Sequence, residues 1–154
     1  MISTIPEFSK EWRVTFDIKP LKKVGCLGSI LHITTGSNCC SYGSRIPGIW
    51  FDKNSFKLVV ANAVNGQGNY QITMEDPLIA NIFNTVIVEQ VKINGHYTII
   101  IRINGTPFKS IINDKPEVFS NVKVYAADPW HEPANTIVKN LQINPNLPPN
   151  SKFL

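Results

Sequence analysis

The chain has 154 residues, enough for one domain that buries a core without needing disulfides or metals. Its net charge of +4 comes from scattered lysines rather than a basic stripe, which argues against nucleic-acid binding. No apolar run approaches the ~20 residues that a membrane-spanning helix needs, so no membrane insertion is expected. Residues that favour β-structure outnumber helix formers, and the sequence therefore predicts one mostly β domain.

Apolar and polar residues alternate along the chain, which is the pattern of half-buried β-strands. In EWRVTFDIKPL, the apolar residues from Trp12 to Ile18 fall on one face. Two Asn-Gly pairs, at Asn94 and Asn104, tolerate the positive φ of tight hairpin turns and predict a three-stranded meander over residues 85–112. No helix is expected. After the first strand, we expect strands at residues 29–35, 48–52, 56–63, 70–74, 85–93, 96–103, 107–112, 122–127 and 136–143.

Short antiparallel strands in this number have to close into a barrel or pack as two sheets, because one open sheet leaves an apolar face in water. We expect an all-β, antiparallel two-sheet sandwich over residues 1–144. Residues 145–154 are rich in proline, which donates no ladder hydrogen bond, so this tail should run extended over the surface or project from it. Its final Phe153-Leu154 either packs on a neighbouring subunit or is a disordered end.

The three cysteines, Cys26, Cys39 and Cys40, allow several states. The spacing of a four-ligand zinc site is absent, which argues against metal binding. A bridge from Cys26 to either of the others is disfavoured, because the strand between them spans roughly 26 Å. A bond between Cys39 and Cys40 would be strained but fits a tight loop. We expect idle thiols first, and an intersubunit disulfide through Cys26 or Cys39 second.

The stretch NCCSYGSRIPGIWF, residues 38–51, indicates a structural corner that leads into a buried strand. Trp50 alternates with Ile49 and Phe51 and is expected in the core. Arg45 is expected either to pair with a carboxylate that pins the loop or to offer its planar fork of donors to a ligand. From this corner we nominate Arg45 and Tyr42 for ligand contact.

The loop AADPWHEPAN, residues 126–135, is the most suggestive stretch for function. Its prolines stiffen the backbone on both sides of Trp130. An aromatic ring displayed beside hydrogen-bonding groups suits a sugar, because the ring stacks on the C–H face of the sugar. Alternatively, Trp130 folds back and caps the sandwich. The candidate ligand-binding residues of this loop are Asp128, Trp130, His131, Glu132 and Asn135.

A second polar loop, AVNGQGNY at residues 63–70, is expected to be a plain hairpin turn, since no helix follows it to cradle a phosphate. Its Asn69 is a candidate sugar ligand if this loop lies near residues 128–132. None of the three histidines forms a local catalytic signature with Ser or Cys. Calcium sites favour denser acidic loops than this chain carries. We therefore expect no catalytic residue, no metal and no cofactor.

Several segments resemble known domains. VIVEQVKINGHYTIIIRINGTPFKSI, with the later IVKNLQI, resembles laminin-G-like and concanavalin A-like jelly-roll domains. SILHITTGSNCCSYGSRIPGIWF and NVKVYAADPW are similar to a module of secreted and cell-surface proteins of marine invertebrates. The resemblance implies a jelly-roll sandwich with adhesion or sugar binding as its usual functions. It departs from the glycosidases of this fold, whose catalytic Glu-x-Asp-x-Glu pattern does not occur here.

These observations together predict a non-enzymatic, lectin-like module that recognises extracellular glycans or glycoproteins, with galactosides as one candidate class. The alternative is a protein-binding adhesion or structural module without a sugar site, and a glycosidase comes third. A single shallow site binds weakly, so a homo-oligomer is expected to gain strength through avidity. We expect the protein to be extracellular, although the chain shows no signal-peptide pattern at its start.

Overall fold

The computed structural model describes residues 1–149, and the chain is all-β over that range. No helix able to cross a membrane occurs among these residues. The strands, in chain order, are β1 (Ser3–Phe8), β2 (Trp12–Lys22), β3 (Gly28–Thr34), β4 (Gly48–Phe51), β5 (Leu58–Val64), β6 (Gln67–Thr73), β7 (Asn84–Ile93), β8 (His96–Ile103), β9 (Thr106–Ile112), β10 (Phe119–Ala126), β11 (Glu132–Pro133) and β12 (Asn135–Asn144).

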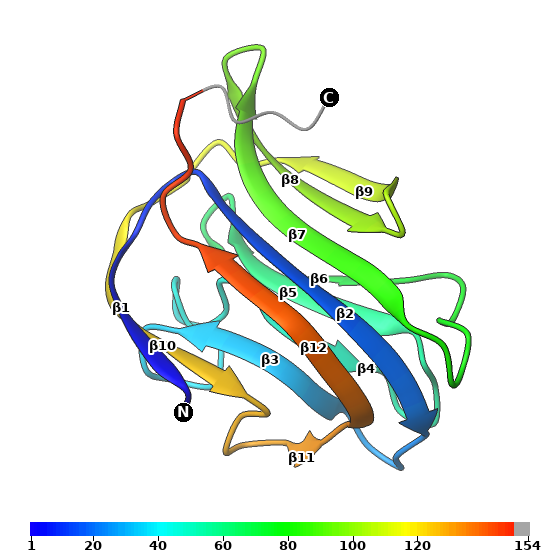
Figure 1. Cartoon of the computed structure of the whole chain (residues 1–154). Helices are drawn as coiled ribbons and strands as arrows, with labels where there is room; N and C mark the ends of the chain where they lie inside the picture. The colour runs from blue at the N-terminus through cyan, green and yellow to red at the C-terminus, as the bar shows by residue number, and fades with distance from the viewer. Residues whose placement is uncertain (150–154) are drawn as a thin grey trace.

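The strands form two sheets that pack face to face (Figure 1). The seven-stranded sheet has the order β1-β10-β3-β4-β5-β6, with β11 beside β3. The five-stranded sheet has the order β12-β2-β7-β8-β9. Strand neighbours are antiparallel except for the short β11–β3 pair, which is parallel. The predicted all-β, antiparallel two-sheet sandwich is confirmed.

The core between the sheets follows from the alternation in the sequence. Along β2, every second side chain from Trp12 to Ile18 is buried, and the residues between them are partly exposed. The buried row packs in one cluster with Ile33, Ile49 and Phe51 of the opposite sheet. Burying one large apolar side chain contributes roughly 1.5–3 kcal/mol. The side chains of this cluster come from both sheets, so their burial holds the two sheets together.

Asn-Gly pairs make three of the hairpin turns. Asn94 joins β7 to β8, Asn104 joins β8 to β9, and Asn65 joins β5 to β6. The φ angles at these three asparagines are 49°, 50° and 53°, in the left-handed region that Asn and Gly tolerate best. The predicted meander over residues 85–112 and the plain hairpin at 63–70 are both confirmed.

Two strands escape the sequence prediction. β1 contains Pro6 in its middle, and the chain accommodates it because β1 lies at the edge of its sheet, paired only with β10. β11 is only two residues long, too short to show a period.

In the predicted tail, Leu147 is buried beside Val91 and Ile100 on the five-stranded sheet. The expected contact of Phe153-Leu154 lies outside the described residues.

Two loops cover part of the outer face of the seven-stranded sheet, the face turned away from the core. One joins β3 to β4, and the other runs from β10 past β11 to β12. The first loop packs directly on β6 at Gly68, because a Cβ there would overlap the backbone carbonyls of Cys40 and Ser41. The second loop is fastened where the Ala134 N–H donates to the Ser29 carbonyl oxygen over 2.9 Å.

Candidate functional site

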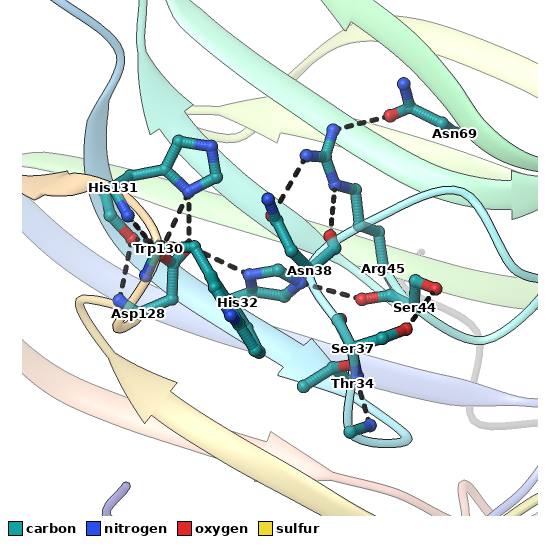
Figure 2. Close-up of polar contacts among 12 residues, drawn as sticks. His32, Thr34, Ser37, Asn38, Ser44, Arg45, Asn69, Asp128, Trp130 and His131 are labelled. Atoms are coloured by element: carbon teal, nitrogen blue, oxygen red, sulfur yellow. Dashed lines mark hydrogen bonds and ion pairs between the residues drawn. The ribbon is translucent and has the colours of Figure 1, made fainter.

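The two loops bring polar and aromatic side chains together above β3 and β4. Figure 2 shows the imidazoles of His32 and His131 on either side of the Asp128 carboxylate, and the guanidinium of Arg45 between Asn38 and Asn69. We refer to these six residues, together with Trp50 and Trp130, as the outer-face cluster.

Asp128 anchors the second loop. Its side chain is buried and accepts hydrogen bonds from His32 Nδ1 at 2.9 Å, from His131 Nδ1 at 2.9 Å and from Ser29 Oγ at 3.1 Å. The backbone N–H groups of Trp130 and His131 also donate to it, at 2.9 and 2.8 Å. Burial opposes ionisation of this carboxyl group, but the hydrogen bonds from His32, His131 and Trp130 outweigh it and hold the pKa of Asp128 well below its ordinary range.

His32 connects Asp128 to the first loop through its two ring nitrogens. The side chain is fully buried, and its Nε2 lies 2.7 Å from the backbone carbonyl oxygen of Ser44 while Nδ1 faces Asp128. Because a carboxylate and a carbonyl only accept, each ring nitrogen has to act as a donor. A β-bulge between Ser29 and Leu31 shifts the register of β3, and Ser29 joins His32 at the same carboxylate.

Trp130 and His131 form the exposed part of the second loop. Trp130 is 39% exposed, and its ring centroid lies 5.4 Å from that of His32 and 5.7 Å from that of Tyr125. His131 Nδ1 donates to the Asp128 carboxylate, and its Nε2 has no hydrogen-bond partner among residues 1–149. Trp130 therefore rests on the sheet through part of its ring and still presents a surface to a ligand.

Arg45 crosses the other side of the cluster and is only 6% exposed. Nε donates to the Asn38 carbonyl oxygen at 2.9 Å, Nη2 to Asn38 Oδ1 at 3.3 Å, and Nη1 to Asn69 Oδ1 at 2.6 Å. Burial lowers the pKa of Arg45, and the charge of Asp128 opposes that shift. The expected carboxylate partner is wrong: within the described range, amide oxygens take its place.

Trp50 lies beneath these groups. The indole is buried, as expected, but it sits on the outer face of β4, while its neighbours Ile49 and Phe51 point into the core between the sheets. The Arg45 guanidinium carbon lies 4.6 Å from the Trp50 ring centroid, and the His131 ring centroid lies 5.3 Å from it. A Cβ at Gly48 would overlap the indole, so Gly48 makes room for Trp50.

The cysteines differ from the sequence expectation. Cys39 and Cys40 form a disulfide between adjacent residues, so the expectation of idle thiols there is wrong, and Cys39 is not available for an intersubunit bridge. Cys26 is a free thiol that donates to Glu132 Oε2 over 3.1 Å. This hydrogen bond raises the pKa of Cys26.

No group of three His, Cys, Asp or Glu side chains that could hold a metal ion occurs in the part of the chain that the structure describes.

The nominated residues divide into those inside the cluster and those outside it. Tyr42 packs on Phe119, and its hydroxyl donates to the carbonyl of Lys115. Glu132 lies beside Cys26, and Asn135 begins β12 in the other sheet, opposite Lys22. The structure brings the remaining five nominated residues into the cluster: Arg45, Asn69, Asp128, Trp130 and His131.

Sequence reasoning missed three members of the cluster as site residues: His32, Trp50 and Asn38. The signal for His32 and Trp50 is present in the alternation, since both fall on the face of their strands opposite the core residues Ile33 and Ile49. No local pattern identifies Asn38, because its partner Arg45 reaches it only through the fold of the loop.

No protein-family model matches the chain, and no curated protein matches it in sequence. Solved structures do match it. A heptameric SAP-like pentraxin from Limulus polyphemus superposes with a TM-score of 0.61 at 18% identity, over 92% of this chain and 66% of the pentraxin chain. A proposed carbohydrate-binding protein from Bacteroides ovatus gives a TM-score of 0.63 at 14% identity, over 92% of this chain and 40% of the other.

A family 18 polysaccharide lyase matches as well, with a TM-score of 0.51 at 10% identity, over 90% of this chain and 74% of the lyase. The chain thus spans 66% and 40% of the lengths of the pentraxin and of the Bacteroides protein. At these identities the likeness shows the fold alone, which is a two-sheet jelly-roll β-sandwich.

Proposed function

We propose that this chain is a non-enzymatic, lectin-like module that binds glycans at the outer-face cluster. One observation carries the proposal: Trp130 is 39% exposed on a loop whose base, Asp128, is buried and held by five side-chain and backbone donors. A rigid loop that presents an aromatic ring loses little conformational freedom when a ligand stacks on it.

The neighbouring polar atoms suit a sugar. His131 Nε2 is available beside Trp130, and Asn69 with Gln71 forms an amide pair linked over 3.1 Å at the edge strand β6. In this proposal Trp130 stacks on the sugar, and His131 and Asn69 orient its hydroxyl groups. Asp128 serves as a positioning residue, because its oxygens are already taken.

The matched structures support this function through the fold. The Bacteroides protein is proposed to bind carbohydrate, and this chain shares its sandwich at a TM-score of 0.63. We propose galactosides as a ligand class, an extracellular location, and a homo-oligomer that strengthens weak single-site binding by avidity. With Cys39 engaged, Cys26 is the cysteine that would link subunits covalently.

A glycan array with the purified protein tests the proposal, together with a matched pair of variants. Trp130→Ala is expected to abolish binding with little change in melting temperature, because the ring is partly exposed. Phe83→Ala removes a ring that belongs to a residue also 39% exposed, immediately before β7 of the other sheet, and is expected to leave binding intact. Equal binding by both variants contradicts a site at Trp130, and a blank array contradicts a lectin.

A protein-binding module is the second candidate, and a surface feature favours it. Ile79, Ile82 and Phe83, in and beside the loop that follows β6, are 66%, 47% and 39% exposed. Such apolar side chains suit a protein partner. If protein binding is the function, free saccharides do not compete with the partner.

Because a polysaccharide lyase shares the fold, the array ligands are also checked for chain shortening, and cleavage contradicts the non-enzymatic proposal.

A further inference from the structure

We propose that the glycan bound at the outer-face cluster is acidic, and that Arg45 binds the carboxylate of a uronic or sialic acid residue. This inference rests on the proposed glycan-binding function and names its ligand class. It begins from the electrostatics of one side chain, the buried guanidinium of Arg45.

No carboxylate among residues 1–149 forms a direct ion pair with Arg45. The residue is 6% exposed, and its three hydrogen bonds within residues 1–149 all go to oxygens of Asn38 and Asn69, which are neutral. Burying a charge without an opposite charge is costly. Asp128 is the carboxylate that acts on it, but that carboxylate is already committed to His32 and His131. An arriving anion would therefore be stabilised at Arg45.

Hydrogen-bond donors are also left over around the same point. A guanidinium has five N–H groups, and Arg45 uses three of them in the described part of the chain. The indole Nε1–H of Trp50, directly beneath Arg45, is buried and has no acceptor there. Buried donors of this kind are normally satisfied, so the cluster is short of acceptors rather than of donors.

A carboxylate supplies both missing properties. It carries the negative charge that Arg45 lacks, and its oxygens only accept hydrogen bonds. The planar N–H groups of Arg match the geometry of a carboxylate better than a Lys ammonium does. Arg45 and His131 both contact Trp50, at 4.6 and 5.3 Å from its ring centroid, so one ligand can meet both while its sugar ring lies on Trp130.

The decisive comparison changes the ligand and leaves the protein intact. Oligogalacturonate and its carboxyl-reduced form, a neutral galactan oligosaccharide, are titrated against the wild-type protein by calorimetry. Hydrogen bonds to a charged group contribute enough that the neutral form is expected to bind at least about tenfold more weakly. The same comparison is made with sialylated and desialylated oligosaccharides, and the tenfold loss is expected in at least one of these pairs.

The outcomes separate this inference from the proposed function. If neutral glycans bind as well as their acidic forms, the acidic ligand is wrong and the lectin function stands. If no neutral, carboxylated or sulfated glycan on an array binds, both are wrong. If only sulfated glycans bind, the carboxylate is wrong.

Variants then locate the contact. Arg45→Lys keeps the charge but removes the planar fork, and it is expected to reduce or abolish the preference for the acidic oligosaccharide. Lys109→Gln removes a positive charge from exposed β9 in the other sheet and is expected to retain the preference. An equal loss in both variants would indicate a general charge effect and contradict a contact at Arg45. Melting curves show that each variant is folded, and the ligand comparison decides the question if Arg45→Lys is not.

Discussion

The outer faces of the two sheets differ in whether a buried charged side chain is paired with an opposite charge. On the five-stranded sheet, the Glu89 side chain is 2% exposed and is held by two arginines, Arg13 Nε at 2.7 Å and Arg102 Nη1 at 3.1 Å. On the seven-stranded sheet, Arg45 is almost as deeply buried, and its hydrogen-bond partners in the described part of the chain are neutral amide oxygens. The first face compensates its charges within the chain. The second leaves a cation and spare donors, which is the more suitable surface for an anionic ligand.

The largest effect is expected from Asp128→Asn, which removes the anchor of the outer-face cluster. Two buried or half-buried histidines would lose their charged partner, and breaking a buried ion pair costs about 3–5 kcal/mol. We expect a loss of that order in the free energy of unfolding, measured by urea denaturation, together with loss of glycan binding. A stable variant that still binds would show that the anchor does not organise the site.

The same carboxylate predicts a dependence on pH. The pKa of Asp128 is lower in the folded protein than the unfolded value of about 3.9. Its stabilising contribution is therefore complete above about pH 4 and is lost as the pH falls below that value towards the lower folded-state pKa. The stability difference between wild type and Asp128→Asn should shrink on acidification, measured by urea denaturation in stepped buffers. A difference that grows there would reverse the sign of this prediction.

Glu89→Gln tests the other face. Its arginine partners are 13% and 17% exposed, so solvent screens the pair, and we expect a smaller loss of about 2 kcal/mol in the free energy of unfolding. Glycan affinity of the folded protein should not change, because Glu89 lies on the sheet opposite the outer-face cluster. Reduced affinity in a fully folded variant would mean that the two faces are not independent.

Gly48→Ala tests whether the position of Trp50 matters for the site. The added methyl group would overlap the indole, and overpacking of this kind costs about 1–3 kcal/mol. Displacing Trp50 should also weaken glycan binding, because Arg45 and His131 both rest against it. Gly25→Ala is the matched control, since nothing lies within 4 Å of a Cβ there. Melting curves and calorimetric titration of both variants measure the two effects, and equal behaviour would contradict the role of Gly48.

Reduction of the Cys39–Cys40 bond is expected to change stability least. The bond joins adjacent residues and closes almost no chain loop, so the free energy of unfolding should change by about 1 kcal/mol or less. Affinity should fall more noticeably, because Asn38, which holds Arg45, directly precedes the bond. Calorimetric titration with and without reductant, using Cys26→Ser to exclude the free thiol, measures this. Unchanged affinity would separate the disulfide from the site.

Most of the fold could be predicted from the sequence, and much less of the site. Alternation and Asn-Gly turns are local, so β2 and the β7-β8-β9 meander follow from neighbouring residues. The site depends on contacts between distant segments: Arg45 meets Asn69, and His32 meets Asp128. The sequence left two roles open for Arg45, a carboxylate partner or contact with a ligand, and only the fold shows that the carboxylate of Asp128 is already held by the two histidines.

The pairing of β2 has a consequence for how the protein is made. This early strand lies between β7 and β12, so one of its two neighbours is the last strand of the sandwich. Until β12 has been synthesised, one edge of β2 stays unpaired, and β1 likewise waits for β10. Pairings between segments so far apart in the chain form slowly. The nascent chain therefore exposes open strand edges during most of its synthesis, which is when it is most prone to associate with other unfinished chains.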